Sequence, residues 1–267
     1  MLIRPWPIVI AVASCLASSL VSSYVRAQVV EEEETKVLKP VADNYDPANS
    51  PDVAEAAARI VVLTNALRQQ EKAEKVEVNT ELRKTAQYFA DYMARTSRYG
   101  HQADGNAPDS RAKKYDYEYC IIAENIAYQY SSVGFTTEEL AQKFFEGWKA
   151  SPPHHKNMVD PDVVETGLAI AQGESGYFFA VQMFGRPKSM SVEFEISNRS
   201  ETAVKYKMGD KSFDLDPRVT RTHEGCRLRD LAFRWSDSDG KEQAVQPSDG
   251  DHFAVTQEGE TLRLKKE

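Results

Sequence analysis

Three short stretches decide how this 267-residue chain folds: YGH at residues 99–101, AENIA at residues 123–127 and WKASPPHHKNM at residues 148–158. They place two histidines, His101 and His154, and one carboxylate, Glu124, in separate elements of the chain. Imidazole titrates near neutral pH and binds borderline metals, and a carboxylate is its usual hydrogen-bond partner. Spacing alone leaves open whether these side chains meet in one cleft.

Helical patterns surround the three stretches. Ser50 is predicted as the N-cap of a first helix, with Pro51 in its first turn. Gly100 is well suited to helix termination, which predicts that His101 lies just past the end of a second helix. The four predicted helices start near residue 50, at Asn79 or Thr80, at Asp109 and at Thr137.

The last of these helices leads into the second histidine. Thr136 and Glu139 have the spacing of a capping box, and the predicted helix runs to Ala150. Two prolines then interrupt it, so His154 is expected at a rigid turn or at the start of a new helix. We interpret Ser151 as an N-cap rather than as a nucleophile.

Strand patterns follow. Residues 168–171 and 177–183 read as a β-hairpin. The pattern changes near Pro187, after which Val192, Phe194 and Ile196 alternate with charged residues. Together these segments predict a small β-sandwich after a helix-bearing region. Its further strands are predicted at residues 203–208, 212–215, 231–235, 253–256 and 261–264.

Several of these motifs resemble those of the CAP superfamily, the SCP-like extracellular proteins, in its bacterial branch. The resemblance covers residues 52–187, and it implies an α-β-α sandwich, so the whole chain is expected to be α/β with an all-β module at its end. The motifs that carry it are, in chain order, Leu63-Thr64-Asn65-Ala66-Leu67-Arg68, Gly100-His101 with Asp104-Gly105, Glu124-Asn125-Ile126-Ala127, Ser151-Pro152-Pro153-His154-His155-Lys156-Asn157-Met158, Thr166-Gly167-Leu168 and Gln182-Met183-Phe184-Gly185.

The resemblance also implies a site. Family members have a cleft lined by two His and two Glu, which corresponds here to His101, Glu124 and His154. The position of the second Glu is Ser151, and Glu146 is a possible substitute rather than a match. Asn125 is expected to hold backbone groups of a loop.

A metal is one possible occupant of this cleft. Two neutral imidazoles, His101 and His154, with a carboxylate or water can hold zinc or another divalent ion with an open position. The alternative is that both histidines only hydrogen-bond within a packed cleft. No cofactor is therefore assigned.

The N-terminus has the features of an export signal. Residues 8–21 are mainly apolar, and Val25-Arg26-Ala27 offers a small-residue cleavage site, so residues 1–27 are predicted to be a signal peptide. An uncleaved anchor and a lipoprotein modified at Cys15 are the alternatives. The sequence predicts a secreted or periplasmic protein, with an envelope lipoprotein as the less favoured location and no membrane span after cleavage.

Composition and net charge limit the kinds of partner that this chain is expected to bind. Residues 28–50 carry a run of four Glu and read as a disordered acidic linker. The predicted CAP and β regions then occupy residues 51–187 and 188–267. The net charge is −8 and no basic stripe is present, which argues against nucleic acid as a partner. After signal removal two cysteines remain, Cys120 and Cys226, and their pairing is left open.

We expect binding of an extracellular or envelope ligand in the histidine-lined cleft, with lipids, glycans and peptides all compatible with the breadth of the family. One alternative is a metal-assisted hydrolase, in which His101, His154 and Glu124 hold or activate a water molecule. The incomplete set of four residues argues against it, so an enzyme is not the favoured interpretation. The third interpretation is a surface adhesion protein whose cleft is inert.

Overall fold

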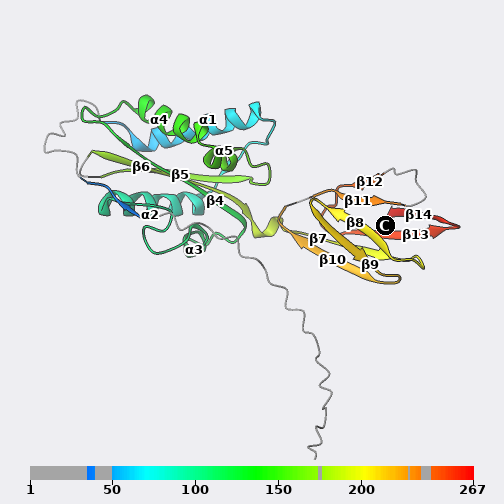
Figure 1. Cartoon of the computed structure of the whole chain (residues 1–267). Coiled ribbons are helices and arrows are strands. Elements are labelled where there is room, and N and C mark those ends of the chain that lie inside the picture. Colours follow the sequence, from blue (N-terminus) through cyan, green and yellow to red (C-terminus); the bar gives the residue numbers. More distant parts are fainter. Residues whose placement is uncertain (1–34, 40–49, 174–175, 228, 236–241) are drawn as a thin grey trace, which may run out of the picture. The chain divides into compact units, whose positions relative to one another are not determined.

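The computed structural model describes residues 35–39, 50–173, 176–227, 229–235 and 242–267 (Figure 1). The predicted signal peptide, including Cys15, and most of the acidic linker lie outside the described residues, which include residues 35–39 and 50 of that linker. In the described part, no helix is long and apolar enough to cross a membrane.

A four-stranded sheet organises the first half of the chain. Its strands lie in the order β2-β5-β6-β4, antiparallel except for the β2–β5 pair. These strands are β2 (Glu77–Val78), β4 (Tyr119–Tyr130), β5 (Glu165–Gln172) and β6 (Tyr177–Pro187). The predicted hairpin is confirmed as β5 and β6, and both strands are longer than expected.

Helices cover both faces of this sheet, which confirms the α-β-α sandwich (Figure 1). The helices on one face are α1 (Val53–Gln70), α4 (Thr137–Ala150) and α5 (Pro152–Val159). Those on the other are α2 (Thr80–Thr96) and α3 (Pro108–Lys114).

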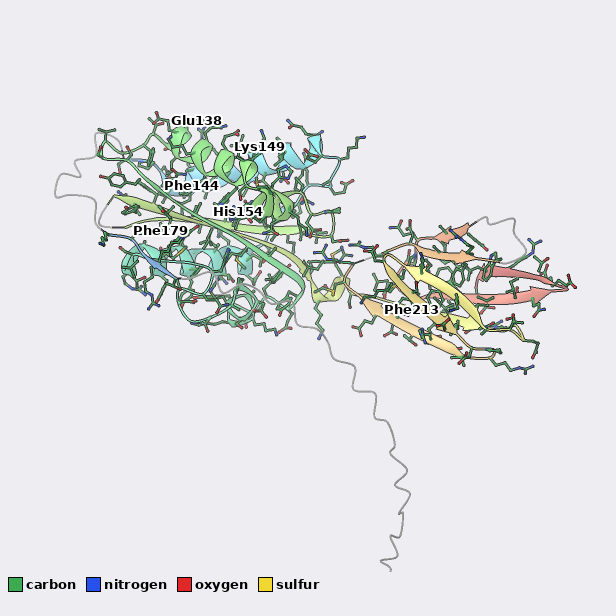
Figure 2. The ribbon with its side chains drawn as sticks, in the orientation of Figure 1. Glu138, Phe144, Lys149, His154, Phe179 and Phe213 are labelled. Carbon is green, nitrogen blue, oxygen red and sulfur yellow. A yellow bond between two sulfur atoms is a disulfide. The ribbon has the colours of Figure 1, made fainter. Side chains whose placement is uncertain are left out.

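Strand β6 shows why the sheet needs both layers. Phe178 and Phe184 belong to the core under α1, α4 and α5, whereas Phe179 and Met183 belong to the core under α2. Because side chains alternate along a strand, a strand that is apolar at every position must be covered on both faces. Figure 2 shows Phe144 of α4 and Phe179 on opposite sides of the sheet.

Two helix ends differ from the sequence prediction. Asp52, not Ser50, caps α1, because its carboxylate accepts hydrogen bonds from the amides of Ala54 and Glu55. Helix α2 ends at Thr96 because Ser97 adopts a left-handed conformation with φ 54°, so Gly100 is not its terminator. A short strand, β3 (Arg98–Tyr99), follows and pairs with β1 (Lys36–Val37).

The rest of the chain forms two four-stranded sheets, in the orders β10-β7-β13-β14 and β12-β11-β8-β9. Both contribute to one apolar core, for example through Ile196 and Phe253 from the first sheet and Tyr206 and Phe233 from the second. Strands β10 and β12 are additional to those predicted. The strands are β7 (Val192–Asn198), β8 (Val204–Met208), β9 (Lys211–Leu215), β10 (Thr220–Gly225), β11 (Leu231–Arg234), β12 (Glu242–Val245), β13 (Asp251–Glu258) and β14 (Thr261–Lys266).

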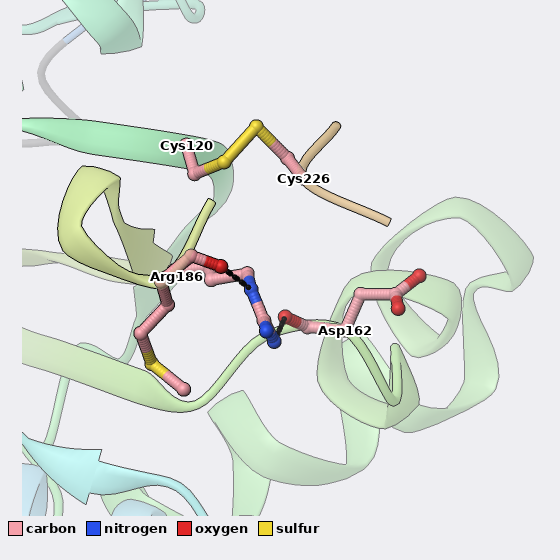
Figure 3. The surroundings of a disulfide bond; sticks show 5 residues. Cys120, Asp162, Arg186 and Cys226 are labelled. Atoms are coloured by element: carbon pink, nitrogen blue, oxygen red, sulfur yellow. Dashed lines mark hydrogen bonds between the residues drawn. A yellow bond between two sulfur atoms is a disulfide. The ribbon is translucent and has the colours of Figure 1, made fainter. Parts of the chain in front are cut away.

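A disulfide between Cys120 of β4 and Cys226, just after β10, settles the cysteine pairing (Figure 3). Next to it, the Arg227 guanidinium donates to the carboxylates of Asp160 and Asp162 at 2.6–2.9 Å. A 3-10 turn, Lys188–Met190, links β6 to β7. Whether residues 188–267 fold independently stays a prediction.

Candidate functional site

His101 and Glu124 form the centre of the candidate site. His101 follows β3, and Glu124 lies in the middle of β4. The Nδ1 atom of His101 lies 2.7 Å from Oε1 of Glu124. The Glu124 side chain is 1% exposed and that of His101 is 31% exposed, so the carboxylate is buried and the imidazole reaches the surface.

Arg111 of α3 holds this carboxylate from the other side. Its Nη2 atom donates to both oxygens of Glu124, at 2.9 and 2.7 Å, and its Nη1 atom donates to Asp104 at 2.9 Å. The guanidinium lies over the ring of Phe89, 3.5 Å from its centroid. Arg111 therefore compensates two buried carboxylates at once.

This arrangement fixes the tautomer of His101. Because Arg111 donates hydrogen bonds to both oxygens of Glu124, we infer that Nδ1 of His101 is the donor in the 2.7 Å contact. In the neutral ring the Nε2 atom is then an acceptor. Glu124 thus orients the imidazole and defines its hydrogen-bonding character.

Helix α5 brings His154 to the same segment of β4. The Asn125 side-chain amide donates to the carbonyl of His154 at 3.1 Å. Asn157, one turn further on, donates to the Asn125 side chain at 2.9 Å and to the Glu124 carbonyl at 3.4 Å. Asn125 therefore holds a backbone group of helix α5 and not, as expected, one of a loop. The convergence of the His154 side chain on His101 and Glu124 stays a prediction.

Comparison with known proteins identifies this part of the chain. Residues 61–184 match the family model of the cysteine-rich secretory protein family, CAP. This region is a CAP domain. An uncharacterised protein of Bacillus subtilis, YkwD, is 25% identical over 185 residues, which cover 61% of this chain and 68% of that protein.

Solved structures with a similar fold include two bacterial proteins. An outer surface protein of Borrelia burgdorferi is 20% identical with a TM-score of 0.46, covering 51% of this chain and 96% of that one. An extracellular protein containing an SCP domain from Bacillus anthracis is 21% identical with a TM-score of 0.41, covering 50% of this chain. The present chain spans 41% of the length of that structure.

The remaining polar residues of the CAP domain do not replace the missing second Glu. Glu146 accepts a hydrogen bond from Gln142 at 3.0 Å on the exposed face of α4, and its side chain is 51% exposed. Ser151 occupies the N-cap position of α5, as predicted, but its side chain makes no capping hydrogen bond. Within the described part of the chain, neither Glu146 nor Ser151 forms a hydrogen bond or an ion pair with Glu124.

The donor set of the CAP domain fits a resident metal poorly. Among the described residues, no three His, Cys, Asp or Glu side chains are placed to hold a metal ion. Both oxygens of Glu124 already accept hydrogen bonds from Arg111, and one of them also contacts His101. The described residues therefore offer no third ligand besides the two imidazoles, and the assignment of His101 and His154 to a metal stays a prediction.

Sequence reasoning missed Arg111 and the role of Asp104. Helix α3 carries three basic residues, Arg111, Lys113 and Lys114, and only the fold shows which of them points inward. The available signal was indirect, since a buried carboxylate such as Glu124 requires a partner. That requirement predicts a cation near Glu124 without naming it.

Proposed function

We propose that this chain is an exported binding protein whose CAP domain recognises an extracellular or envelope ligand at the surface formed by His101, Glu124 and His154. The export signal read from residues 1–27 supports the location, as do the extracellular and outer-surface proteins among its structural relatives. The ligand class is a lipid, a glycan or a peptide. Binding without turnover is the function that the site supports best.

One observation carries this proposal: the 2.7 Å contact between a partly exposed imidazole and a buried, doubly bonded carboxylate. Maintaining a buried carboxylate is costly unless it is paired. Here Arg111 supplies that pairing for Glu124 and His101 adds a hydrogen bond, and the result is one oriented imidazole at the surface. An oriented imidazole offers a defined hydrogen bond to a ligand without needing a metal.

The test is a binding screen with lipid vesicles, a glycan array and a peptide library, using the whole chain. Binding through this site should weaken about tenfold or more in His101→Ala, because a hydrogen bond that orients a ligand is worth roughly 1–2 kcal/mol. His155→Ala is the matched control and should bind as the wild type does. A ligand that binds both variants equally would show that this cleft is inert.

The hydrolase alternative is tested by a zinc titration of the wild type, His101→Ala, His154→Ala and His155→Ala. If both candidate histidines bind zinc, either of their substitutions abolishes binding, and binding weakens as the pH falls below about 6.5, where imidazole protonates. With no third ligand we expect weak affinity at most. Tight binding lost in both variants would favour the metal-assisted reaction.

A further inference from the structure

Strand β5 has no partner strand among the described residues along most of its outer edge. Strand β6 pairs with every residue of β5 on one side, from Glu165 to Gln172. On the other side β2 pairs only with Glu165 and Thr166. From Leu168 to Ala171, no residue in the described part of the chain pairs with this edge. An open edge presents unpaired backbone donors and acceptors to another strand.

The backbone direction along this edge follows from one hydrogen bond. The Asn79 amide donates to the Thr166 carbonyl at 2.8 Å, so the backbone groups of Thr166 face outward, toward β2. Directions alternate along a strand. The N–H and C=O groups of Leu168 and Ile170 therefore also face outward, whereas those of Ala169 and Ala171 face β6.

A groove runs along this edge between α1 and α2. Two cavities of about 640 and 440 Å³ form it, and they share Val53, Gln87 and Ile170 in their walls. Gly167 lets α2 lie close, because an added Cβ would be 2.2 Å from the backbone of Arg83. Neither cavity is lined by His101, Glu124 or His154, so the groove is separate from the candidate site.

The two walls of the groove differ in chemistry. The α1 wall is apolar and includes Val61 and Val62, the latter 68% exposed. Asp91 and Arg95 of α2 line the second cavity, and the α2 wall of the first carries Arg83 and Lys84, both exposed. Within the part of the chain that the structure describes, neither Arg83 nor Lys84 forms an ion pair. Two exposed cations without an ion-pair partner attract carboxylates locally, so this wall favours an acidic partner over a basic one.

We propose that this groove binds an extended acidic peptide, which adds to the outer edge of β5 as a further strand. Side chains of an added strand point alternately to the two faces of the sheet. Apolar residues would then contact α1, and acidic residues would contact Arg83 and Lys84. The preferred peptide alternates apolar and acidic residues.

The probe is a capped eight-residue peptide of alternating valine and glutamate, added to the whole chain while amide hydrogen exchange is followed by NMR. The amides of Leu168 and Ile170 should exchange at least about tenfold more slowly at saturation, because they become hydrogen-bonded. Those of Ala169 and Ala171, which already face β6, should change little. A peptide N-methylated at alternate residues, which cannot pair, should not bind.

Charge reversal tests the recognition of acidic residues. Arg83→Glu/Lys84→Glu should weaken peptide binding about tenfold, since two attractive charges at the groove become repulsive. Lys207→Glu/Lys211→Glu makes the same change in net charge on the β region and should bind as the wild type does. A peptide of alternating valine and lysine should bind the Arg83→Glu/Lys84→Glu variant better than the wild type.

Three outcomes would overturn the proposal. The first is no slowing of exchange at Leu168 and Ile170, and the second is equal binding of the N-methylated peptide. The third is that both amides are already protected in the free chain and exchange only after deletion of residues 40–49. In that case the chain's own segment covers the edge. None of these results bears on ligand binding at His101.

Discussion

Arg111 is the cation that pairs with two buried carboxylates of the CAP domain, Asp104 and Glu124. Its side chain and those of Asp104 and Glu124 are at most 1% exposed, so all three charges are removed from water. The attraction between such groups roughly offsets their desolvation, but removing one partner leaves an uncompensated charge. The ion network is therefore a requirement for the orientation of His101 rather than a large net source of stability.

Replacing Arg111 with methionine should lower the free energy of unfolding by about 3–5 kcal/mol, because Glu124 and Asp104 lose their cation. Urea denaturation followed by tryptophan fluorescence measures the change. Arg59→Met is the control, since Arg59 pairs with Glu55 and Glu138 on the surface and its loss should cost at most about 1 kcal/mol. Equal effects of the two substitutions would contradict the structural role of Arg111.

His223 makes the β region sensitive to pH. Burial, assisted by the nearby Arg221, lowers the pKa of His223 below 6.5, and its Nε2 atom lies 2.5 Å from the Tyr206 hydroxyl. The unfolded chain binds this proton at a higher pH than the folded chain does. The neutral folded form therefore contributes stability above about pH 6.5 and loses it as the pH falls through the lower, folded pKa.

Between about pH 8 and pH 5, the free energy of unfolding should fall more in the wild type than in His223→Gln. Denaturant titrations at several pH values measure the difference, in which contributions from other groups cancel. His252→Gln is the matched control, because His252 is 59% exposed and its variant should follow the wild-type profile. Parallel profiles for the wild type and His223→Gln would show that His223 is protonated equally in both states.

At the scale of elements, α5 is fixed to β4 by side-chain amides rather than by apolar contacts alone. Asn125 is fully buried and links the His154 carbonyl to Asn157. Met158 is the one fully buried apolar side chain within the described helix α5. The direction of the His154 end of α5 therefore depends on one buried amide.

Asn125→Leu should destabilise the protein by about 2–4 kcal/mol, because the His154 carbonyl and the Asn157 amide lose buried partners. Thermal and urea denaturation measure the change. Gln142→Leu, which removes an exposed helical amide bonded to Glu146, is the control and should cost less than about 1 kcal/mol. A smaller effect at Asn125 than at Gln142 would mean that apolar packing alone positions α5.

Elements with strong local signals could be predicted, and those defined by pairing could not. The capping box of Thr136 and Glu139 predicted the start of α4, and the interaction is present. Strand β4, which carries Glu124, was not predicted, because its edge position mixes polar and apolar residues without strict alternation. Strand β10 likewise has a polar sequence, and only its pairing with β7 makes it a strand.

The same limit applied to the candidate site. The histidines and Glu124 could be proposed because short motifs surround them, and the His101–Glu124 contact is present. Arg111 lies on a different element, and no local rule connects it with Glu124. Long-range contacts depend on how the two helical layers enclose the sheet, and a single sequence records that arrangement only indirectly.

At the scale of the whole molecule, the disulfide joins two segments that are 106 residues apart. Cys120 lies before the composition change at Pro187 and Cys226 lies after it, so the bond crosses the predicted boundary. Asp160 strengthens this connection. Burial is the largest single effect on its carboxyl and opposes ionisation, but hydrogen bonds from Arg227 and the Asp162 amide, together with the charges of Arg227 and Arg68, lower its pKa. Two parts of the chain that fold separately would therefore remain attached.

Limited proteolysis should cut between residues 186 and 191. In this segment β6 ends at Pro187 and the turn Lys188–Met190 leads to β7. The cut chain should run as one band on a non-reducing gel and as two bands after reduction, because the Cys120–Cys226 bond bridges the cut. Cys120→Ser/Cys226→Ser is the matched variant and should give two bands under both conditions. Cleavage elsewhere, with this segment intact, would mean that residues 188–267 are not a separate domain. Closing a loop of this length stabilises by up to about 4–5 kcal/mol in the chain-entropy model, so the variant should also unfold at lower urea concentration.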